Sequence, residues 1–415
     1  MKFLLVFILA ITFAESSPRY EKYQKLIQKI AKSPLLQKSF ESNLKIFGGE
    51  AEKSEFPCEI LPPSPTVPTS VHQLRPSDIK IVAALGDSLT AGNGITAKTI
   101  LGVLREDRGD SFSIGGDGTF EDQITIPNIL KRYNPSITGY STKSGDIKKK
   151  NSAFNVADPG NVFMDLTDEA NLLISRMQAD PNIDINNDWK LITILIGDND
   201  LCDICNEDGH EAERYIATME KTLQILQDNL PRTIVNVVEV LNANIVKKLN
   251  KGLICSVVHF FLCKCAAYPK NDVAEQELIN MTRLYQTSLH DLAISGKFDT
   301  KDDFTVVDQP FFRNTYPPTK AGSDDLDLSY FAPDCFHLSS KGQSNTATAL
   351  WNNMFQPVGQ KTLNWELGSP ITCPTEVSPP SKKIHTYIPI KTVAVARIEV
   401  KAWTFMDSGK EIPNT

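Results

Sequence analysis

Ser88 stands where a nucleophile would be placed, directly after an apolar run. Residues 81–85 (Ile-Val-Ala-Ala-Leu) have the length and composition of a buried strand and lead into Gly86-Asp87-Ser88. A serine at a strand-to-helix turn exposes its hydroxyl, and the N-terminus of the next helix favours developing negative charge. The same triplet would also serve as an ordinary helix N-cap. It is not the Gly-x-Ser-x-Gly turn of the α/β-hydrolases, because Thr90 takes the last position.

A base and its orienting carboxylate occur together late in the chain, in Asp334-Cys335-Phe336-His337. A serine becomes nucleophilic when a base takes its proton, and the base needs a partner that orients it. Three-residue spacing on a turn lets Asp334 reach the imidazole Nδ1 of His337 and leaves Nε2 facing Ser88. An isolated pair of this kind is typical of a surface loop. Its place after the last predicted strand, just before a helix start at 339–343, favours catalysis.

Two segments offer donors for an oxyanion. Residues 155–160 (Asn-Val-Ala-Asp-Pro-Gly) end in Gly160, whose N–H can approach a substrate closely. Residues 197–200 (Gly-Asp-Asn-Asp) follow another apolar run and offer the amide of Asn199. Each segment taken alone is also a normal turn sequence.

Strand-length apolar runs alternate with helical periodicity over the middle of the chain. The runs cover residues 81–85, 191–196, 233–238 and 304–307. Helical spacing of apolar residues lies between them at 216–230 and 278–292. Runs that are apolar on both faces suit a parallel sheet covered by helices, so the sequence predicts a three-layer α/β/α fold. Ligands bind beyond the carboxyl ends of such strands, where the candidate residues fall.

Composition and the first residues indicate in which compartment the protein acts and which partners are excluded. The chain has 415 residues, with 43 Lys and Arg against 50 Asp and Glu, and a formal charge of −7 argues against a nucleic-acid partner. The apolar run 3–14 after Lys2 reads as a cleaved signal peptide, assigned to residues 1–17. The alternative, an uncleaved anchor, is disfavoured because the run is shorter than the ~20 residues that span a bilayer. We expect a secreted protein with no transmembrane anchor.

Two proline-rich segments, 57–76 and 370–380, divide the chain. They predict an N-terminal extension over 18–57, a catalytic domain over 58–375 and a C-terminal tail over 376–415. The extension carries apolar residues at helical spacing, and we expect it to be loosely attached rather than packed as an amphipathic helix. Residues 386–405 alternate in places, which predicts a short strand or hairpin, or else a disordered tail.

The cysteine count is even, as expected for disulfides in an exported protein. The eight are Cys58, Cys202, Cys205, Cys255, Cys263, Cys265, Cys335 and Cys373. Their pairing is open from the sequence. The alternative is a zinc site made by Cys202, Cys205, Cys263 and Cys265.

Taken in order, the four blocks that hold Ser88, Gly160, Asn199 and His337 resemble the GDSL or SGNH hydrolase family. Segments outside these blocks, among them 68–76, 113–118 and 350–359, look like its phospholipase B branch. The resemblance covers about residues 58–373. It implies a flavodoxin-like fold around a central parallel sheet.

The resemblance also implies roles. Ser88 would be the nucleophile, His337 the general base and then acid, and Asp334 the orienting carboxylate. The N–H groups of Ser88 and Gly160 and the Asn199 amide would form the oxyanion hole. The implied reaction is hydrolysis of acyl esters of glycerophospholipids and lysophospholipids at a micelle or membrane surface, through an acyl-enzyme. It needs no metal and no cofactor, and no protein partner can be identified.

Three features depart from that branch. Asp198 stands where glycine is expected, so a carboxylate could face the oxyanion or point to solvent. Asp158-Pro159 is also unusual and stiffens the loop before Gly160. The tail carries Lys391, Arg397 and Lys401 where membrane-associated relatives have an apolar anchor.

Some alternatives stay open. Residues 253–263 form the most apolar stretch outside the strands, which predicts either a lid that touches lipid or a buried segment. Asn280-Met281-Thr282 is a sequon for N-glycosylation. The function could also be that of another ester hydrolase of this fold, or of a catalytically inactive lipid-binding protein.

Overall fold

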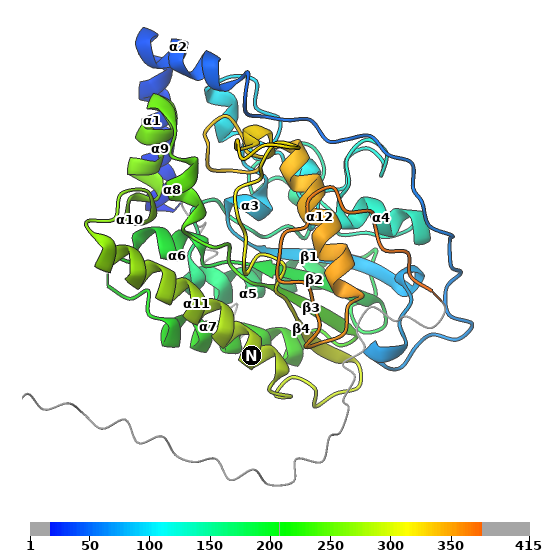
Figure 1. The fold of residues 1–415 in the computed structure, drawn as a ribbon. Coiled ribbons are helices and arrows are strands. Elements are labelled where there is room, and N and C mark those ends of the chain that lie inside the picture. Colours follow the sequence, from blue (N-terminus) through cyan, green and yellow to red (C-terminus); the bar gives the residue numbers. More distant parts are fainter. Residues whose placement is uncertain (1–16, 207, 376–415) are drawn as a thin grey trace, which may run out of the picture. The chain divides into compact units, whose positions relative to one another are not determined.

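The computed structural model describes residues 17–375 except residue 207 (Figure 1). The predicted strand or hairpin at 386–405 and most of the predicted signal peptide lie outside the described residues. No helix within 17–375 combines the length and apolar character needed to cross a membrane.

Four parallel strands form the sheet, in the spatial order β1-β2-β3-β4. They are β1 (Ile79–Gly86), β2 (Trp189–Leu195), β3 (Thr233–Val238) and β4 (Phe304–Gln309). Ala84 of β1 pairs with Thr193 of β2, and Val235 of β3 lies between Ile192 and Val306. All four predicted strands are confirmed. The pattern located them because parallel strands buried on both faces are rich in Ile, Val and Leu.

A further segment adds to the free edge of β1. Thr138 makes an isolated parallel bridge with Ile81, and Asn155 makes another with Ala84. The segment after β1 therefore lies along one edge of that strand, and β2 pairs with the other edge. The strand order reverses at β1, and this is where open α/β sheets bind their ligands.

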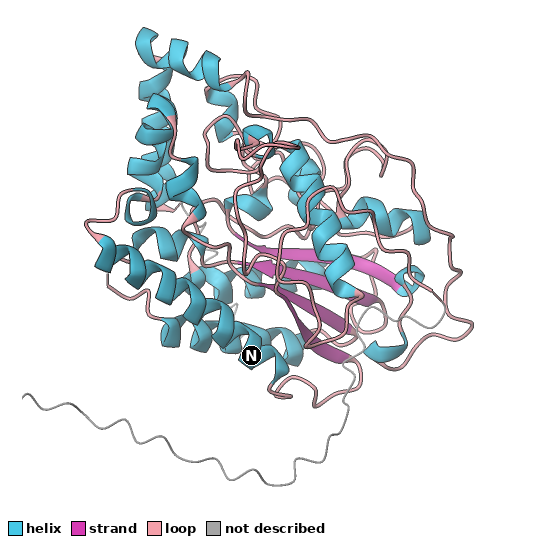
Figure 2. Ribbon diagram, in the orientation of Figure 1, coloured by secondary structure: helices cyan, strands magenta, loops and turns pink. Residues whose placement is uncertain are grey.

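Helices cover both faces of the sheet, so the predicted three-layer architecture is confirmed (Figure 2). On one face lie α5, α7 and α11, and on the other lie α4 and α12. The helices are α1 (Pro18–Ala31), α2 (Pro34–Asn43), α3 (Ser88–Ala91), α4 (Ile126–Tyr133), α5 (Leu166–Ala179), α6 (Asp198–Asp203), α7 (Ala212–Asn229), α8 (Ile245–Leu249), α9 (Gly252–Leu262), α10 (Lys264–Ala267), α11 (Asp272–Ile294) and α12 (Ser340–Met354).

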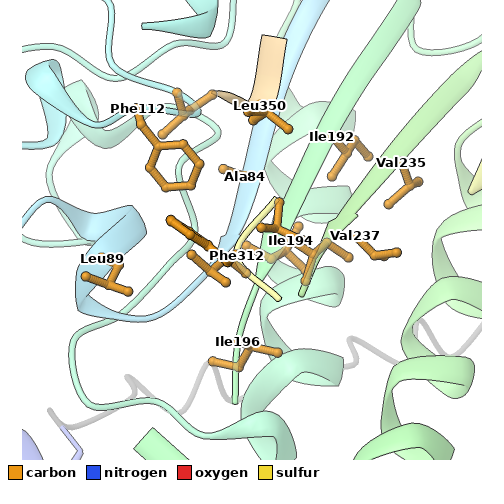
Figure 3. Packing of buried hydrophobic residues seen from close by; sticks show 14 of the residues in the cluster. Ala84, Leu89, Phe112, Ile192, Ile194, Ile196, Val235, Val237, Phe312 and Leu350 are labelled. Carbon is orange, nitrogen blue, oxygen red and sulfur yellow. The ribbon is translucent and has the colours of Figure 1, made fainter. Parts of the chain in front are cut away.

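The main hydrophobic core lies on the two faces of the sheet. Figure 3 shows how Ile192 and Ile194 of β2 and Val235 and Val237 of β3 point the same way, since alternate residues of a strand share a face. Leu350 of α12 belongs to the same buried cluster. This packing holds the carboxyl ends of the strands in fixed register.

A second, smaller cluster lies apart from that core. Buried side chains of α1 and α2 pack there against α9 and the short 3₁₀ segment η3 (Leu101–Leu104). The members include Leu26, Ile27, Ile30, Ile254 and Val258. The expectation of a loosely attached extension is therefore wrong. Its helical spacing creates an apolar face, and that face is buried against α9 and η3.

All eight cysteines are paired, as Cys58–Cys373, Cys202–Cys263, Cys205–Cys265 and Cys255–Cys335. The four cysteines of the alternative zinc site form two of these disulfides, which removes the thiolates that zinc requires.

Candidate active site

Ser88 is the first residue of α3, and only Asp87 separates it from the end of β1. Asp87 is the N-cap of this helix, and its Oδ1 accepts a hydrogen bond from the Leu89 N–H at 2.9 Å. The N-cap reading thus applies to Asp87 and leaves the hydroxyl of Ser88 available for chemistry. Burial raises the pKa of Asp87 to about 6, against the hydrogen bond from Leu89 and the charge of His337.

Ser88, His337 and Asp334 are brought together as predicted. His337 Nε2 lies 2.9 Å from Ser88 Oγ, and His337 Nδ1 lies 2.6 Å from Asp334 Oδ2. The other oxygen of Asp334 accepts the backbone N–H groups of Phe336 and His337, each at 3.1 Å. Cys335 adopts a φ of +66° within this turn. The three-residue spacing therefore folds the carboxylate back onto the imidazole.

The carboxylate of Asp334 is held ionised. Burial alone would raise its pKa, but the charge of His337 and the hydrogen bonds from His337 and Tyr23 outweigh burial and bring the pKa of Asp334 to about 2. The carboxylate is completely buried. An ionised Asp334 can stabilise positive charge that develops on the imidazole near neutral pH.

Two of the predicted oxyanion donors come from the first turn of α6 and from the loop that holds Gly160. Asn199 lines the same cavity as Ser88, and its side-chain amide donates to the Asn161 carbonyl at 2.8 Å. Gly160 precedes Asn161 and has a φ of +82°, which favours glycine. A Cβ at this position would also collide with Ser17 Oγ. The N-terminus of α1 thus lies directly against the loop that carries Gly160.

Asp198 faces the site rather than solvent. It lines the cavity beside Ser88, and its Oδ1 accepts the Leu241 N–H at 3.0 Å. Burial, followed by the charge of Asp87, raises the pKa of Asp198 well above its usual range. Burial therefore favours the neutral form of this carboxyl group.

The cavity at Ser88 is narrow and apolar. Its volume is about 60 Å³. Its apolar walls come largely from the segment that follows β3 and from the loop that carries His337, through Leu241, Ile245, Val246, Leu249, Phe331 and Phe336. Engineered apolar cavities of about 150 Å³ bind benzene, so a long acyl chain requires this cavity to widen.

Tyr23 is a site residue that the sequence analysis missed. Its hydroxyl donates to Asp334 Oδ2 at 2.6 Å, the oxygen that also contacts His337. Burial, and then the charge of Asp334, raises the pKa of Tyr23 well above its usual value and keeps the phenol protonated. Helical spacing with Leu26, Ile27 and Ile30 signalled that Tyr23 is buried, but nothing in the sequence indicated its partner.

Glu169 was missed as well. It lies on the buried face of α5 and accepts the Gly86 N–H at 2.7 Å and the Asn161 side-chain amide at 2.6 Å. One carboxyl therefore joins the turn before Ser88 to the loop of Gly160. A glutamate among the apolar positions of a helix face was the available signal.

Within the described residues, Glu239, His290 and Asp308 place ligand atoms within 4.8 Å of one another, as a metal site would. Arg313 pairs with Glu239 and lies 3.9 Å from Asp308, so its guanidinium supplies positive charge to the group. These side chains are not among those that line the cavity at Ser88.

The chain matches a family model and is similar to known proteins. Residues 82–350 match the family model described as GDSL-like Lipase/Acylhydrolase. The chain is 42% identical over 351 residues to phospholipase B1, membrane-associated, of Homo sapiens, and 42% identical over 338 residues to the Mus musculus protein of that name. These matches cover 81% and 79% of this chain.

The chain spans about a quarter of the length of these relatives, 24% for the human protein and 23% for the mouse protein. A solved extracellular lipase from Streptomyces rimosus is 15% identical, covers 64% of this chain and 95% of its own, and has a TM-score of 0.28. The family match alone covers more than half of the chain and includes the residues that meet at Ser88. The chain therefore belongs to the GDSL-like lipase/acylhydrolase family of ester hydrolases.

Proposed function

We propose that this chain is a secreted phospholipase B that removes acyl chains from glycerophospholipids and then from lysophospholipids. The observation that carries the proposal is the hydrogen-bonded line from Ser88 Oγ to His337 Nε2 and from His337 Nδ1 to Asp334. Its support for phospholipids in particular is the identity with proteins named phospholipase B1. The walls of the cavity at Ser88 are apolar, as an acyl chain requires, and the cavity would widen to admit a long one.

In the proposed reaction, Ser88 Oγ attacks the ester carbonyl carbon while His337 Nε2 takes the hydroxyl proton. Asp334 stabilises the imidazolium that forms. Negative charge develops on the carbonyl oxygen, where the N–H groups of Ser88 and Gly160 and the Asn199 amide are proposed to donate. The ester bond then breaks, and His337 gives its proton to the leaving glyceryl oxygen. The same groups activate water, which hydrolyses the acyl-enzyme and releases the fatty acid.

Secretion is proposed on two grounds. The apolar run at 3–14 has the features of a signal peptide, and four disulfides are typical of proteins that fold in an oxidising compartment. A lipid partner is proposed from the cavity and the relatives. Other ester substrates of this fold remain the second candidate, since the triad geometry serves any acyl ester.

The product pattern tests the proposal. The full chain is given a phosphatidylcholine whose two acyl chains differ in mass, and the products are followed by mass spectrometry. We expect a lysophospholipid to appear first and then disappear as the second fatty acid is released. Hydrolysis of a soluble short-chain ester without attack on phospholipid would favour another ester hydrolase. Failure with both substrates would favour the inactive lipid-binding protein.

A further inference from the structure

One face of helix α9 is buried, and it packs on the loop that carries His337 and on α1 and α2. Cys255 forms a disulfide with Cys335, which lies next to the proposed carboxylate Asp334. His259 contacts the Cys335 carbonyl at 2.9 Å, and Cys263 is tied to Cys202 of α6. Buried Ile254, Val258 and Leu262 complete this face. The helix is thus fixed on the loop that carries His337, and this face fits the second of the two predictions for residues 253–263, a lid or a buried segment.

The opposite face of α9 is apolar and open. Leu253, Phe260 and Phe261 are 44%, 48% and 57% exposed, and Tyr268, just beyond α10, is 38% exposed. The rings of Phe260 and Phe261 lie 5.5 Å apart, and those of Phe260 and Tyr268 lie 6.0 Å apart. These four side chains are called the aromatic patch below. Large apolar groups that cluster on a surface mark an interaction site.

The patch lies in a strongly basic part of an acidic protein. Residues 245–271 contain five lysines and neither Asp nor Glu, whereas the whole chain has 43 basic and 50 acidic residues. All five lysines, Lys247, Lys248, Lys251, Lys264 and Lys270, are exposed. Lys264 Nζ stands 5.1 Å from the centre of the Phe260 ring. Among them, Lys247 is paired with Glu275.

The adjoining helices extend this charge. Helices α1 and α2 both pack against α9, at the upper left of Figure 1. Residues 17–47 hold seven Lys and Arg against two Glu, and the exposed Leu35 and Ile46 lie in the same segment. Basic charge and exposed apolar side chains therefore occur together on neighbouring helices of one region.

We infer that the aromatic patch and its lysines form a docking surface for anionic phospholipid membranes. Aromatic and aliphatic side chains of an amphipathic helix enter the boundary between head groups and acyl chains, while lysines bind anionic head groups. The surface lies one helix diameter, about 10 Å, from the loop of His337, because α9 separates the two. Docking here would present lipid beside the cavity that leads to Ser88. This inference rests on the proposed function for its choice of lipid.

Binding is tested without hydrolysis by using the full chain with Ser88→Ala. Its partition is measured onto vesicles of phosphatidylcholine alone and of equimolar phosphatidylcholine and phosphatidylglycerol. We expect stronger binding to the anionic vesicles, weakened by salt. Adding Phe260→Ser and Phe261→Ser should reduce the partition by roughly tenfold or more. The control is Val67→Ser, which removes an apolar side chain that is 65% exposed. Val67 lies near the start of β2, because the carbonyl of the next residue, Pro68, accepts a hydrogen bond from the Trp189 side chain. This variant should leave vesicle binding unchanged.

Charge has its own matched control. Lys251→Glu, Lys264→Glu and Lys270→Glu together should reduce anionic-vesicle binding by roughly tenfold or more. Lys221→Glu, Lys297→Glu and Lys301→Glu change the net charge equally at exposed positions on α7 and between α11 and β4, and should leave most of the binding intact. Equal losses in the two triple variants would show that overall charge, and not this surface, binds the membrane, and would overturn the inference.

Two readouts separate this inference from the proposed function. In the active chain, Phe260→Ser with Phe261→Ser should slow phospholipid hydrolysis on anionic vesicles and leave turnover of a soluble short-chain ester unchanged. Patch-dependent binding by a chain that cleaves no phospholipid would support the docking surface and refute phospholipase action. Undiminished vesicle binding by the Phe260/Phe261 variant would refute docking here. Docking would also be refuted if the chain binds no vesicles and instead forms a dimer in solution that the Phe260/Phe261 variant dissociates.

Discussion

Asp334 Oδ2 is shared by two donors, His337 Nδ1 and the hydroxyl of Tyr23. Both contacts are 2.6 Å long, and all three groups are buried. A carboxylate that accepts two short bonds at one oxygen has little freedom to rotate. The orientation of the imidazole therefore depends on a helix far from it in sequence.

The triad makes unequal demands on its members. We expect Ser88→Ala and His337→Ala each to lower kcat for a soluble ester by about 10⁶, and Asp334→Asn by about 10⁴, because nucleophile and base act as one unit while the carboxylate orients the base. Steady-state kinetics on folded variants, checked by circular dichroism, measure this. Near-normal kcat in His337→Ala would show that the base assignment is wrong.

Tyr23→Phe removes one donor from Asp334 and keeps the aromatic ring. We expect kcat for a soluble ester to fall roughly tenfold with KM unchanged, as for loss of one hydrogen bond to a charged group. The acid limb of the pH profile should move to higher pH, since a carboxylate with fewer donors attracts the imidazole proton more strongly.

Tyr133→Phe is the matched control for Tyr23→Phe. Tyr133 is also buried, and within the described residues its hydroxyl has no hydrogen-bond partner. It should alter neither kcat nor the pH profile. If the two variants behave alike, Tyr23 only packs against the site and does not position Asp334.

At the level of single elements, α3 begins with a buried N-cap whose charge is costly. The pKa of Asp87 is about 6 in the folded chain, against 3.8 ordinarily. Because the folded value is raised, the contribution of Asp87 to stability is full below about pH 4 and is lost as the pH rises through about 6. Asp87→Asn keeps an acceptor for Leu89 and removes this titration.

Relative to the parent chain, the free energy of unfolding of Asp87→Asn should therefore increase between pH 4 and pH 7, by an amount on the order of 2–3 kcal/mol. Its Tm relative to the parent chain should rise over the same range. Thermal unfolding followed at several pH values measures the difference. A difference that stays constant with pH would mean that Asp87 titrates near its ordinary value.

Helix α9 should lose its hold on the catalytic loop when one disulfide is removed. Cys255→Ala with Cys335→Ala opens a loop of 80 residues, and Cys205→Ala with Cys265→Ala opens one of 60 residues. The chain-entropy model assigns each loss about 4 kcal/mol. We expect similar falls in Tm, but a large fall in kcat only for the first pair, because Cys335 neighbours Asp334. Equal effects on kcat would contradict a positioning role for this disulfide.

The sequence predicted the elements whose pattern is local. Val235 and Ile192 lie in runs that are apolar on both faces, so their strands could be located without a structure. Ser88 and His337 could be paired because the ends of parallel strands converge. The attachment of α1 could not be predicted, since it depends on buried side chains of α9 and η3. The contact of Tyr23 with Asp334 joins residues 311 positions apart, and no periodicity records such a meeting.

Over the described residues as a whole, the basic segments coincide with one of the two hydrophobic clusters. The main core packs on the sheet, while the smaller cluster joins α1, α2, α9 and η3. The basic segments 17–47 and 245–271 supply the helices of that smaller cluster. Arg19 of α1 also reaches the Asn199 carbonyl at 3.2 Å and pairs with Asp203. The proposed membrane-facing part and the proposed catalytic part thus meet where α1 contacts α6.

Covalent labelling of the whole chain by a long-chain alkyl fluorophosphonate tests the central claim most directly. The reagent mimics the attacked ester, and intact-mass and peptide analysis locate the adduct. We expect one equivalent, carried by Ser88, with labelling nearly abolished in His337→Ala. An adduct on another serine, or no adduct in a chain that hydrolyses esters, would contradict the assignment of Ser88 and His337 as nucleophile and base.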